Sequence, residues 1–272
     1  MENMFDIKDK CVVITGGAGI LCSEIAMWLA RLGAKICLVD YDALRANEVC
    51  KRIEAEGNFA IPVEASVLDK KQVKEAFVCG LETMGRIDVL MNGAGGNKKE
   101  ATCCAPTTFF ELPDEAIRAV FDLNCMGTMI PSQVFGEQMA KQGTGNIINI
   151  ASMNAFTPLT NIAAYSAAKA AIANFTKWLA TYMAQRHSAD IRVNAIAPGF
   201  FLTKQNEFLL IDEKTGNLSK RGQQIIDHTP MGRFGEPVDL VGTIAWLMSD
   251  ASKFVTGTTI PIDGGFNAYS GV

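Results

Sequence analysis

A tyrosine and a lysine stand four residues apart in a run of small side chains, A-A-Y-S-A-A-K-A-A, at 163–171. On a helix Tyr165 and Lys169 lie on one face, one turn apart, and the small neighbours leave room for a bulky ligand. An ammonium group stabilises a nearby phenolate and lowers the tyrosine pKa, so Tyr165 could exchange a proton with a substrate oxygen. The spacing alone is common by chance, and it then describes a partly exposed tyrosine and a solvated lysine on a packing helix.

Three further polar residues lie where they could join this pair. Ser152 closes an apolar run, N-I-I-N-I-A-S, and its hydroxyl could hydrogen-bond the same substrate oxygen. Asn124, in F-D-L-N, opens or interrupts a helical segment that would flank the site. Thr203 ends A-P-G-F-F-L-T and could hydrogen-bond a cofactor amide or phosphate.

A glycine-rich turn near the N-terminus indicates a nucleotide site. In T-G-G-A-G-I, Gly16 and Gly19 precede a helix that begins near Ile20. Glycines there let backbone N–H groups approach a pyrophosphate, although a tight turn also needs glycine for its own sake. Asp40 ends the next apolar run, where an acid binds the ribose hydroxyls of NAD and repels the 2′-phosphate of NADP. No arginine stands immediately beside Asp40, so the sequence predicts NAD as the cofactor.

A second stretch of small residues, M-N-G-A-G-G, ends the fourth apolar run. Its small side chains would let the backbone lie flat against a ligand beyond the strand end, where ligands bind in open α/β sheets. A plain glycine turn explains the stretch equally well. The residues concerned are Asn92, Gly93, Ala94 and Gly95.

The segments that carry these residues alternate between two patterns along the whole chain. Short apolar runs indicate strands at 11–15, 35–40, 60–65, 88–92, 146–151, 192–197 and 258–263. Amphipathic segments indicate helices at about 20–32, 42–56, 69–84, 114–142, 162–186 and 237–249. Most runs are apolar on both faces, as in a parallel sheet covered on both sides. The pattern predicts an α/β fold of Rossmann type: a doubly wound, seven-stranded parallel sheet flanked by helices on both faces.

No repeat or linker divides the chain, so we expect one dinucleotide-binding and catalytic domain over 1–272. Residues 96–113 form a polar loop with two prolines, and about 203–235 is a candidate substrate lid built from short helices. Pro131 lies inside the helical segment 114–142 and is expected to kink or split it.

Composition excludes several classes of function. The formal net charge is −4 and the basic residues are scattered, which argues against a nucleic-acid partner. No apolar segment is long enough to span a bilayer and no signal peptide is evident, so we expect no membrane association and a cytoplasmic location. The 8 cysteines form no C-x-x-C pair and only 2 histidines occur, so no metal site is expected.

Together these motifs resemble the short-chain dehydrogenase/reductase family over essentially the whole chain. The resemblance implies a catalytic set made of Asn124, Ser152, Tyr165 and Lys169. It also implies cofactor contacts from Tyr165 and Lys169, from the N-N-A-G motif at residues 92–95, from Ser66 and Val67 after the third strand, and from the P-G-x-x-x-T motif at Pro198, Gly199 and Thr203. Homotetramers are usual in this family.

The chain departs from the family pattern at three places. The usual T-G-x-x-x-G-x-G would put glycines at Ile20 and Cys22, Gly93 replaces the second asparagine of N-N-A-G, and Ser66 stands where an aspartate often contacts adenine. These departures put the detail of the phosphate contacts in question, and they leave the expectation of a cofactor unchanged.

Longer stretches, such as R-V-N-A-I-A-P-G-F-F-L-T-K-Q-N-E-F-L-L, resemble the D-mannonate oxidoreductase branch of the family. This resemblance implies interconversion of D-fructuronate and D-mannonate with NAD(H). A dehydrogenase of another sugar acid or polyol, such as gluconate 5-dehydrogenase, and a catalytically silent nucleotide-binding regulatory protein are the alternatives.

A sugar-acid substrate brings a carboxylate that needs a cation or several N–H donors. We expect Asn154 with a lysine from the loops around the site, Lys204 ahead of Lys98. Substrate contacts would then come from Ser152, Asn154, Tyr165 and Lys204. Arg233, in a Gly/Pro-rich turn, is interpreted as structural.

Overall fold

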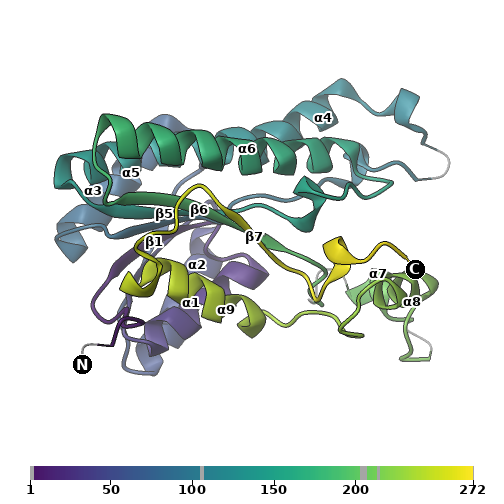
Figure 1. Cartoon of the computed structure of the whole chain (residues 1–272), viewed down its shortest axis with the longest axis horizontal. Helices are drawn as coiled ribbons and strands as arrows, with labels where there is room; N and C mark the ends of the chain where they lie inside the picture. Colours follow the sequence, from purple (N-terminus) through teal and green to yellow (C-terminus); the bar gives the residue numbers. More distant parts are fainter. Residues whose placement is uncertain (1–2, 105–106, 203–206, 213–214, 272) are drawn as a thin grey trace.

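Seven parallel strands form one sheet in the order β3-β2-β1-β4-β5-β6-β7 (Figure 1). The computed structural model describes residues 3–104, 107–202, 207–212 and 215–271. The strands are β1 (Cys11–Thr15), β2 (Lys35–Asp40), β3 (Ala60–Glu64), β4 (Val89–Asn92), β5 (Gly145–Ile150), β6 (Ile191–Pro198) and β7 (Thr259–Ile262). The strand order reverses between β1 and β4, so the sheet is doubly wound and the predicted fold class is confirmed.

Helices cover both faces of this sheet (Figure 1). On one face lie α1 (Ile20–Arg31), α2 (Ala43–Ala55) and α9 (Val238–Met248); on the other lie α3 (Lys70–Met84), α4 (Asp114–Phe121), α5 (Gly127–Gln142) and α6 (Ala163–Arg186). Each face of the sheet carries its own hydrophobic core. In strand β1, Val12 and Ile14 belong to one core and Val13 belongs to the other. Successive strand side chains point to opposite faces, so a sheet covered on both sides needs every residue apolar.

The observed strands agree with the predicted ones to within one residue at each end. The predicted helix at 114–142 is divided, but by a π-helical turn at Asp122–Met126, upstream of Pro131. The position expected for the break was therefore wrong. Pro131 lacks the N–H that would bond Gly127, the first residue of α5, so it costs one bond where the helix has only just restarted.

The segment after β6 contains two short helices, α7 (Glu207–Leu210) and α8 (Lys220–Asp227). They lie beside the C-terminal segment, beyond the end of the sheet (Figure 1). A small hydrophobic cluster of Met153, Leu210, Ile225 and Phe266 joins them to the turn after β5 and to the C-terminal segment. This packing places α7 and α8 next to the carboxyl ends of β5 and β6.

At the carboxyl edge of the sheet, the turn between β1 and α1 packs directly on the loop after β4. A Cβ atom at Gly16 would lie 2.6 Å from the Cα atom of Ala94. One at Gly93 would overlap the sulfur of Cys22 and lie 2.7 Å from the carbonyl oxygen of Thr15. The family motifs usually have glycine at position 22 and asparagine at position 93. This chain has the larger Cys22 facing the smaller Gly93. We interpret the two departures as one compensated exchange of volume.

We predict that Gly93→Ala lowers the free energy of unfolding by about 1–3 kcal/mol, because the new methyl group must displace the Cys22 side chain or the β1 backbone. Adding Cys22→Ala should recover part of this loss. Urea denaturation of the wild type, both single variants and the double variant measures the coupling between the two sites. If the two single effects simply add, the exchange is not compensated.

Candidate active site

A cavity of about 830 Å³ runs along the carboxyl ends of β1 to β6. The turns that follow these strands supply its walls, as expected for an open α/β sheet. It brings together most of the predicted site residues: Gly16, Gly19, Ile20, Asp40, Ser66, Val67, Gly93, Ala94, Gly95, Ser152, Asn154, Tyr165, Pro198 and Gly199. One cavity therefore holds both the predicted nucleotide end and the predicted chemical end.

The nucleotide end fits a dinucleotide. Helix α1 begins after Gly19 with no side-chain cap, so its first N–H groups remain available to an anion at the cavity wall. Asp40 is buried, and its carboxylate accepts the N–H groups of Ala18 at 2.9 Å and Asp42 at 3.0 Å. These bonds fix the carboxylate at the end of β2, where it can still accept hydroxyl groups from the cavity.

Arg45 also lines this end of the cavity, and the sequence analysis missed it. It lies in the first turn of α2, whose N-terminus Asp42 caps by accepting the N–H of Arg45. Arg45 is not adjacent to Asp40 in the sequence, so the residues immediately beside Asp40 do not reveal it. The helical turn brings a residue five positions downstream to the same pocket, so one cation stands near two acids there.

Tyr165 and Ser152 form the chemical end. Burial raises the pKa of the Tyr165 hydroxyl, and a hydrogen bond with Ser152 partly offsets the rise. The expected lowering of this pKa by Lys169 is not seen in the protein alone, where burial is the largest influence and raises the pKa. Tyr165 is therefore protonated at neutral pH and can act as a proton donor.

Lys169 lies beneath the tyrosine ring, with its Nζ atom 5.4 Å from the ring centroid. Its side chain is only 4% exposed, and Nζ donates to the carbonyl oxygen of Ile150 at 2.8 Å. Burial lowers the pKa of Lys169 to about 8. The ammonium is thus held at the end of β5, close to the point where it begins to lose its proton at physiological pH.

Asn124 lies in the π-helical turn between α4 and α5, and its side chain connects this turn to the loop after β4 through hydrogen bonds. Its Nδ2 atom donates to the carbonyl oxygens of Gly96 at 2.7 Å and Val120 at 2.8 Å, and its Oδ1 atom accepts the N–H of Gly96 at 3.2 Å. A Cβ atom at Gly95 would lie 2.7 Å from Oδ1 of Asn124 and 3.2 Å from Nζ of Lys169. Asn124 and Lys169 therefore meet at this loop, and no side chain fits between them.

Other predicted residues have different positions. Asn92 is fully buried and does not line the cavity; its amide donates to Oγ of Ser132 at 3.0 Å and Oδ1 of Asn149 at 2.8 Å, so its predicted cofactor contact is corrected to a link within the core. Arg233 pairs with Asp239 at 2.7 Å, which confirms its structural interpretation. Thr203 and Lys204 lie outside the described residues.

The cavity wall also contains residues that no sequence motif indicated. They come from the segment after β6 and from the turn before α6: Leu159, Ile162, Phe200, Phe201, Leu210 and Arg221. Arg221 is exposed at the start of α8, and its spacing of one helical turn from the buried Ile225 is the pattern that could have placed it on the side of the helix that borders the cavity.

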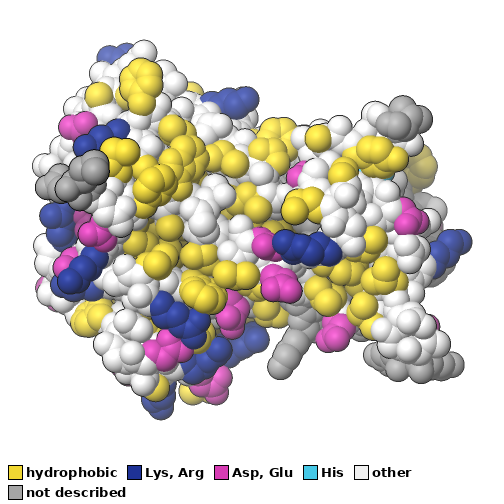
Figure 2. Space-filling model, turned by 60° about the horizontal axis from the view of Figure 1, so that its bottom comes forward, with side chains coloured by type: hydrophobic (Ala, Val, Ile, Leu, Met, Phe, Trp, Pro, Cys, Tyr) yellow, Lys and Arg dark blue, Asp and Glu magenta, His cyan; other side chains and the backbone are white. Residues whose placement is uncertain are grey.

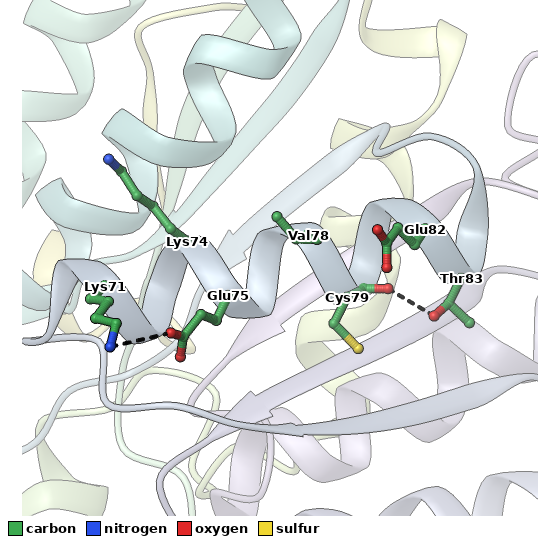
Figure 3. A pocket seen from close by; sticks show the side chains of 7 residues that line it. All are labelled: Lys71, Lys74, Glu75, Val78, Cys79, Glu82 and Thr83. Atoms are coloured by element: carbon green, nitrogen blue, oxygen red, sulfur yellow. Dashed lines mark hydrogen bonds and ion pairs between the residues drawn. The ribbon is translucent and has the colours of Figure 1, made fainter.

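A second hollow lies on the outer face of α3 (Figure 3). All its lining residues come from this one helix, with Lys71 3.8 Å from Glu75 and the Thr83 hydroxyl bonded to the carbonyl of Cys79. The side chains lie along the helix and do not converge on a common point, so the hollow offers no catalytic geometry. Among the described residues, no helix can cross a membrane and no cluster of potential ligands could hold a metal ion.

Comparison with known proteins agrees with this geometry. Residues 18–267 match a family model described as enoyl-(acyl carrier protein) reductase. The "uncharacterized oxidoreductase UxuB" of Bacillus subtilis is 46% identical over 98% of both chains. The 5-keto-D-gluconate 5-reductase of Escherichia coli is 32% identical over 97% of this chain and 98% of its own.

A crystal structure of a Haemophilus protein, provisionally assigned as a D-mannonate oxidoreductase and containing bound NAD, superposes with a TM-score of 0.92. It is 45% identical, and the match covers 98% of each chain. A structure from Beutenbergia cavernae, provisionally assigned as an NAD(P)-dependent gluconate 5-dehydrogenase and containing NADP at low occupancy, has a TM-score of 0.84 at 31% identity over 98% of this chain and all of its own. With its sheet topology, its glycine-lined cavity and these matches, the chain belongs to the short-chain dehydrogenase/reductase family of oxidoreductases.

Proposed function

We propose that this protein uses NAD(H) to interconvert D-fructuronate and D-mannonate. The observation that carries the proposal is the placement of Tyr165 and Ser152 in the wall of one dinucleotide-sized cavity, with the Nζ atom of the buried Lys169 5.4 Å from the centroid of the tyrosine ring. The similarity to a NAD-containing structure assigned as a D-mannonate oxidoreductase supports the choice of substrate. The intact set of Asn124, Ser152, Tyr165 and Lys169 argues against a silent regulatory protein.

In the direction of reduction, bound NADH would supply a hydride to the ketone carbon. Tyr165 gives its proton to the carbonyl oxygen, which becomes the new hydroxyl group. Ser152 hydrogen-bonds that oxygen and orients it toward the tyrosine. Lys169 lies beside the tyrosine ring and stabilises the phenolate that remains, while Asn124 holds the loop that carries Gly95 and Gly96 against the lysine.

A keto-gluconate is the second candidate substrate, because relatives named for that activity match the chain over nearly its whole length. Both substrates are open-chain sugar acids with a ketone, and the same four catalytic side chains serve either. Following NADH absorbance with a panel of keto-uronates and keto-gluconates separates the two candidates.

We predict that the wild type oxidises NADH with D-fructuronate and that Tyr165→Phe lowers kcat by about 10²–10⁴, the usual loss on removing a general acid. The variant keeps the ring, so its folding and its affinity for NADH should stay near those of the wild type. Because Lys169 has a pKa of about 8, kcat/KM for reduction should fall as pH rises above this value. Near-normal turnover by a folded Tyr165→Phe variant would reject the assignment.

The charges around the ribose site predict a preference for NAD over NADP. Asp40 and Asp42 line this end of the cavity. Among the described wall residues, Arg45 is the cation that stands beside them. Asp40→Asn should raise the ratio of kcat/KM for NADPH to that for NADH by about 10-fold, since one repulsive charge is removed. Arg45→Gln should lower the same ratio. A wild type that already prefers NADPH would contradict this interpretation.

We also propose a homotetramer, and α6 supplies one candidate contact surface. Leu179 and Met183 pack inside the subunit, but Trp178 and Tyr182 are 57% and 41% exposed, and their rings stack at 5.1 Å. Hydrophobic side chains also reach the surface on the opposite side of the sheet, around α1 and α9, as Figure 2 shows. Exposed aromatic groups of this kind mark association surfaces.

Sedimentation at micromolar concentration should give a tetramer for the wild type and smaller species for Trp178→Glu. Leu44→Glu, which changes an exposed hydrophobic residue on α2, is the matched control and should sediment as the wild type does. A monomeric wild type would reject the tetramer.

A further inference from the structure

The two ends of the cavity differ in charge, because every acidic wall residue among those described lies at the nucleotide end. Asp40, Asp42 and Arg45 lie at the end of β2, where the nucleotide is expected. Toward the chemical end, the charged wall residues among those described are Lys98 and Arg221, and Lys169 lies buried beneath. A pocket lined by one sign of charge attracts a ligand of the opposite sign. The chemical end is therefore built for an anion.

Arg221 is held at this end by the packing of α8. Ile225, one turn further along the helix, contacts the cluster that contains Met153, the residue between Ser152 and Asn154. The start of α8 is fixed because the N–H of Ser219 donates to the carbonyl oxygen of Leu210 at 2.8 Å. Gly222 packs so closely on Leu210 that no side chain would fit. Residues four apart lie on one face of a helix, so the side chains of Arg221 and Ile225 leave α8 on the same side, one turn apart.

The guanidinium of Arg221 makes no hydrogen bond or ion pair with the described residues, although it lines the cavity. Other arginines have such partners: Arg233 binds Asp239, and Arg192 binds the carbonyl oxygens of Leu247 and Ser249. An arginine fork facing a cavity suits a carboxylate, which it can bind through two parallel hydrogen bonds.

Asn154 supplies an independent sign of a ligand on the same wall. Its side chain is 4% exposed, and its Oδ1 atom has no hydrogen-bond partner among the described residues. Its backbone N–H donates to Oγ of Ser152 at 3.2 Å, which fixes it beside the catalytic serine. A buried amide oxygen without a partner is costly, so a polar ligand group is needed to satisfy it.

We propose that Arg221 binds the carboxylate of the substrate and that Asn154 binds a hydroxyl group between this carboxylate and the reacting carbonyl. The inference rests on the proposed sugar-acid oxidoreductase function. It assigns the substrate carboxylate principally to Arg221, where the sequence analysis expected Lys204. The substrate class is then an open-chain polyhydroxy keto acid, held at one end by Ser152 and Tyr165 and at the other by Arg221. Lys98 adds charge to the same end and is the weaker partner, since a lysine binds as a point charge.

The test compares Arg221→Gln with Lys220→Gln, which removes the same charge from the adjacent exposed position outside the cavity wall. Steady-state reduction by NADH is measured with D-fructuronate and with D-fructose, its neutral counterpart. Arg221→Gln should raise KM for D-fructuronate by about 10- to 100-fold, as expected for a lost charge-assisted hydrogen bond, and leave KM for D-fructose within about 2-fold. Calorimetric binding of D-mannonate to the enzyme–NAD complex should weaken by the same factor as KM.

Lys220→Gln should match the wild type in both measurements. Equal KM values for wild type and Arg221→Gln with D-fructuronate, or equal losses with both substrates, would overturn the role of Arg221 while leaving the proposed function intact. If the wild type instead reduces only a keto-gluconate, the proposed substrate fails. The same comparison is then made with the keto-gluconate. A loss of affinity in Arg221→Gln but not in Lys220→Gln supports the role of Arg221, and an unchanged affinity in Arg221→Gln overturns that role. A wild type active only on neutral ketones also overturns it.

Discussion

The loop after β4 is the contact on which both halves of the site depend. From one side the turn between β1 and α1 presses against it, with Gly16 against Ala94 and Cys22 against Gly93. From the other side Asn124 binds the backbone of Gly96 through two hydrogen bonds. Because this loop touches both the glycine turn before α1 and Asn124, its small side chains allow the two ends of the cavity to lie close together.

The proposed catalytic groups are held by hydrogen bonds that compensate for their burial. Lys169 is buried with its Nζ atom donating a hydrogen bond to the carbonyl oxygen of Ile150, yet desolvation still lowers its pKa to about 8. The π-helical turn that carries Asn124 frees backbone carbonyls, and side chains meet them: Thr128 donates to Asn124 at 2.8 Å and Asn124 donates to Val120 at 2.8 Å. The irregular turn is thus stabilised by the residue whose position it sets.

Charge varies along the cavity in a way that orients two ligands. Two acids and Arg45 stand at the end of β2, where the carboxylates can accept hydrogen bonds from sugar hydroxyl groups. The basic groups at the other end suit an acidic substrate, so the two ligands would be drawn to opposite ends of one continuous cavity. Phe200 and Leu210 add hydrophobic surface to the wall of the same cavity.

The sequence by itself determined the sheet, because a strand buried on both faces must be apolar throughout and such runs end sharply. It also predicted Tyr165, Lys169 and Ser152 as candidate catalytic residues, because their types and their positions at a strand end and on a helix follow from local spacing. Only the tertiary structure placed Asn92 in the core, moved the helix break to the turn around Asn124, and brought Arg45 and Arg221 to the cavity. Those outcomes depend on which distant segments pack together. The pattern of residues along one segment does not specify the segments that it contacts in the folded protein.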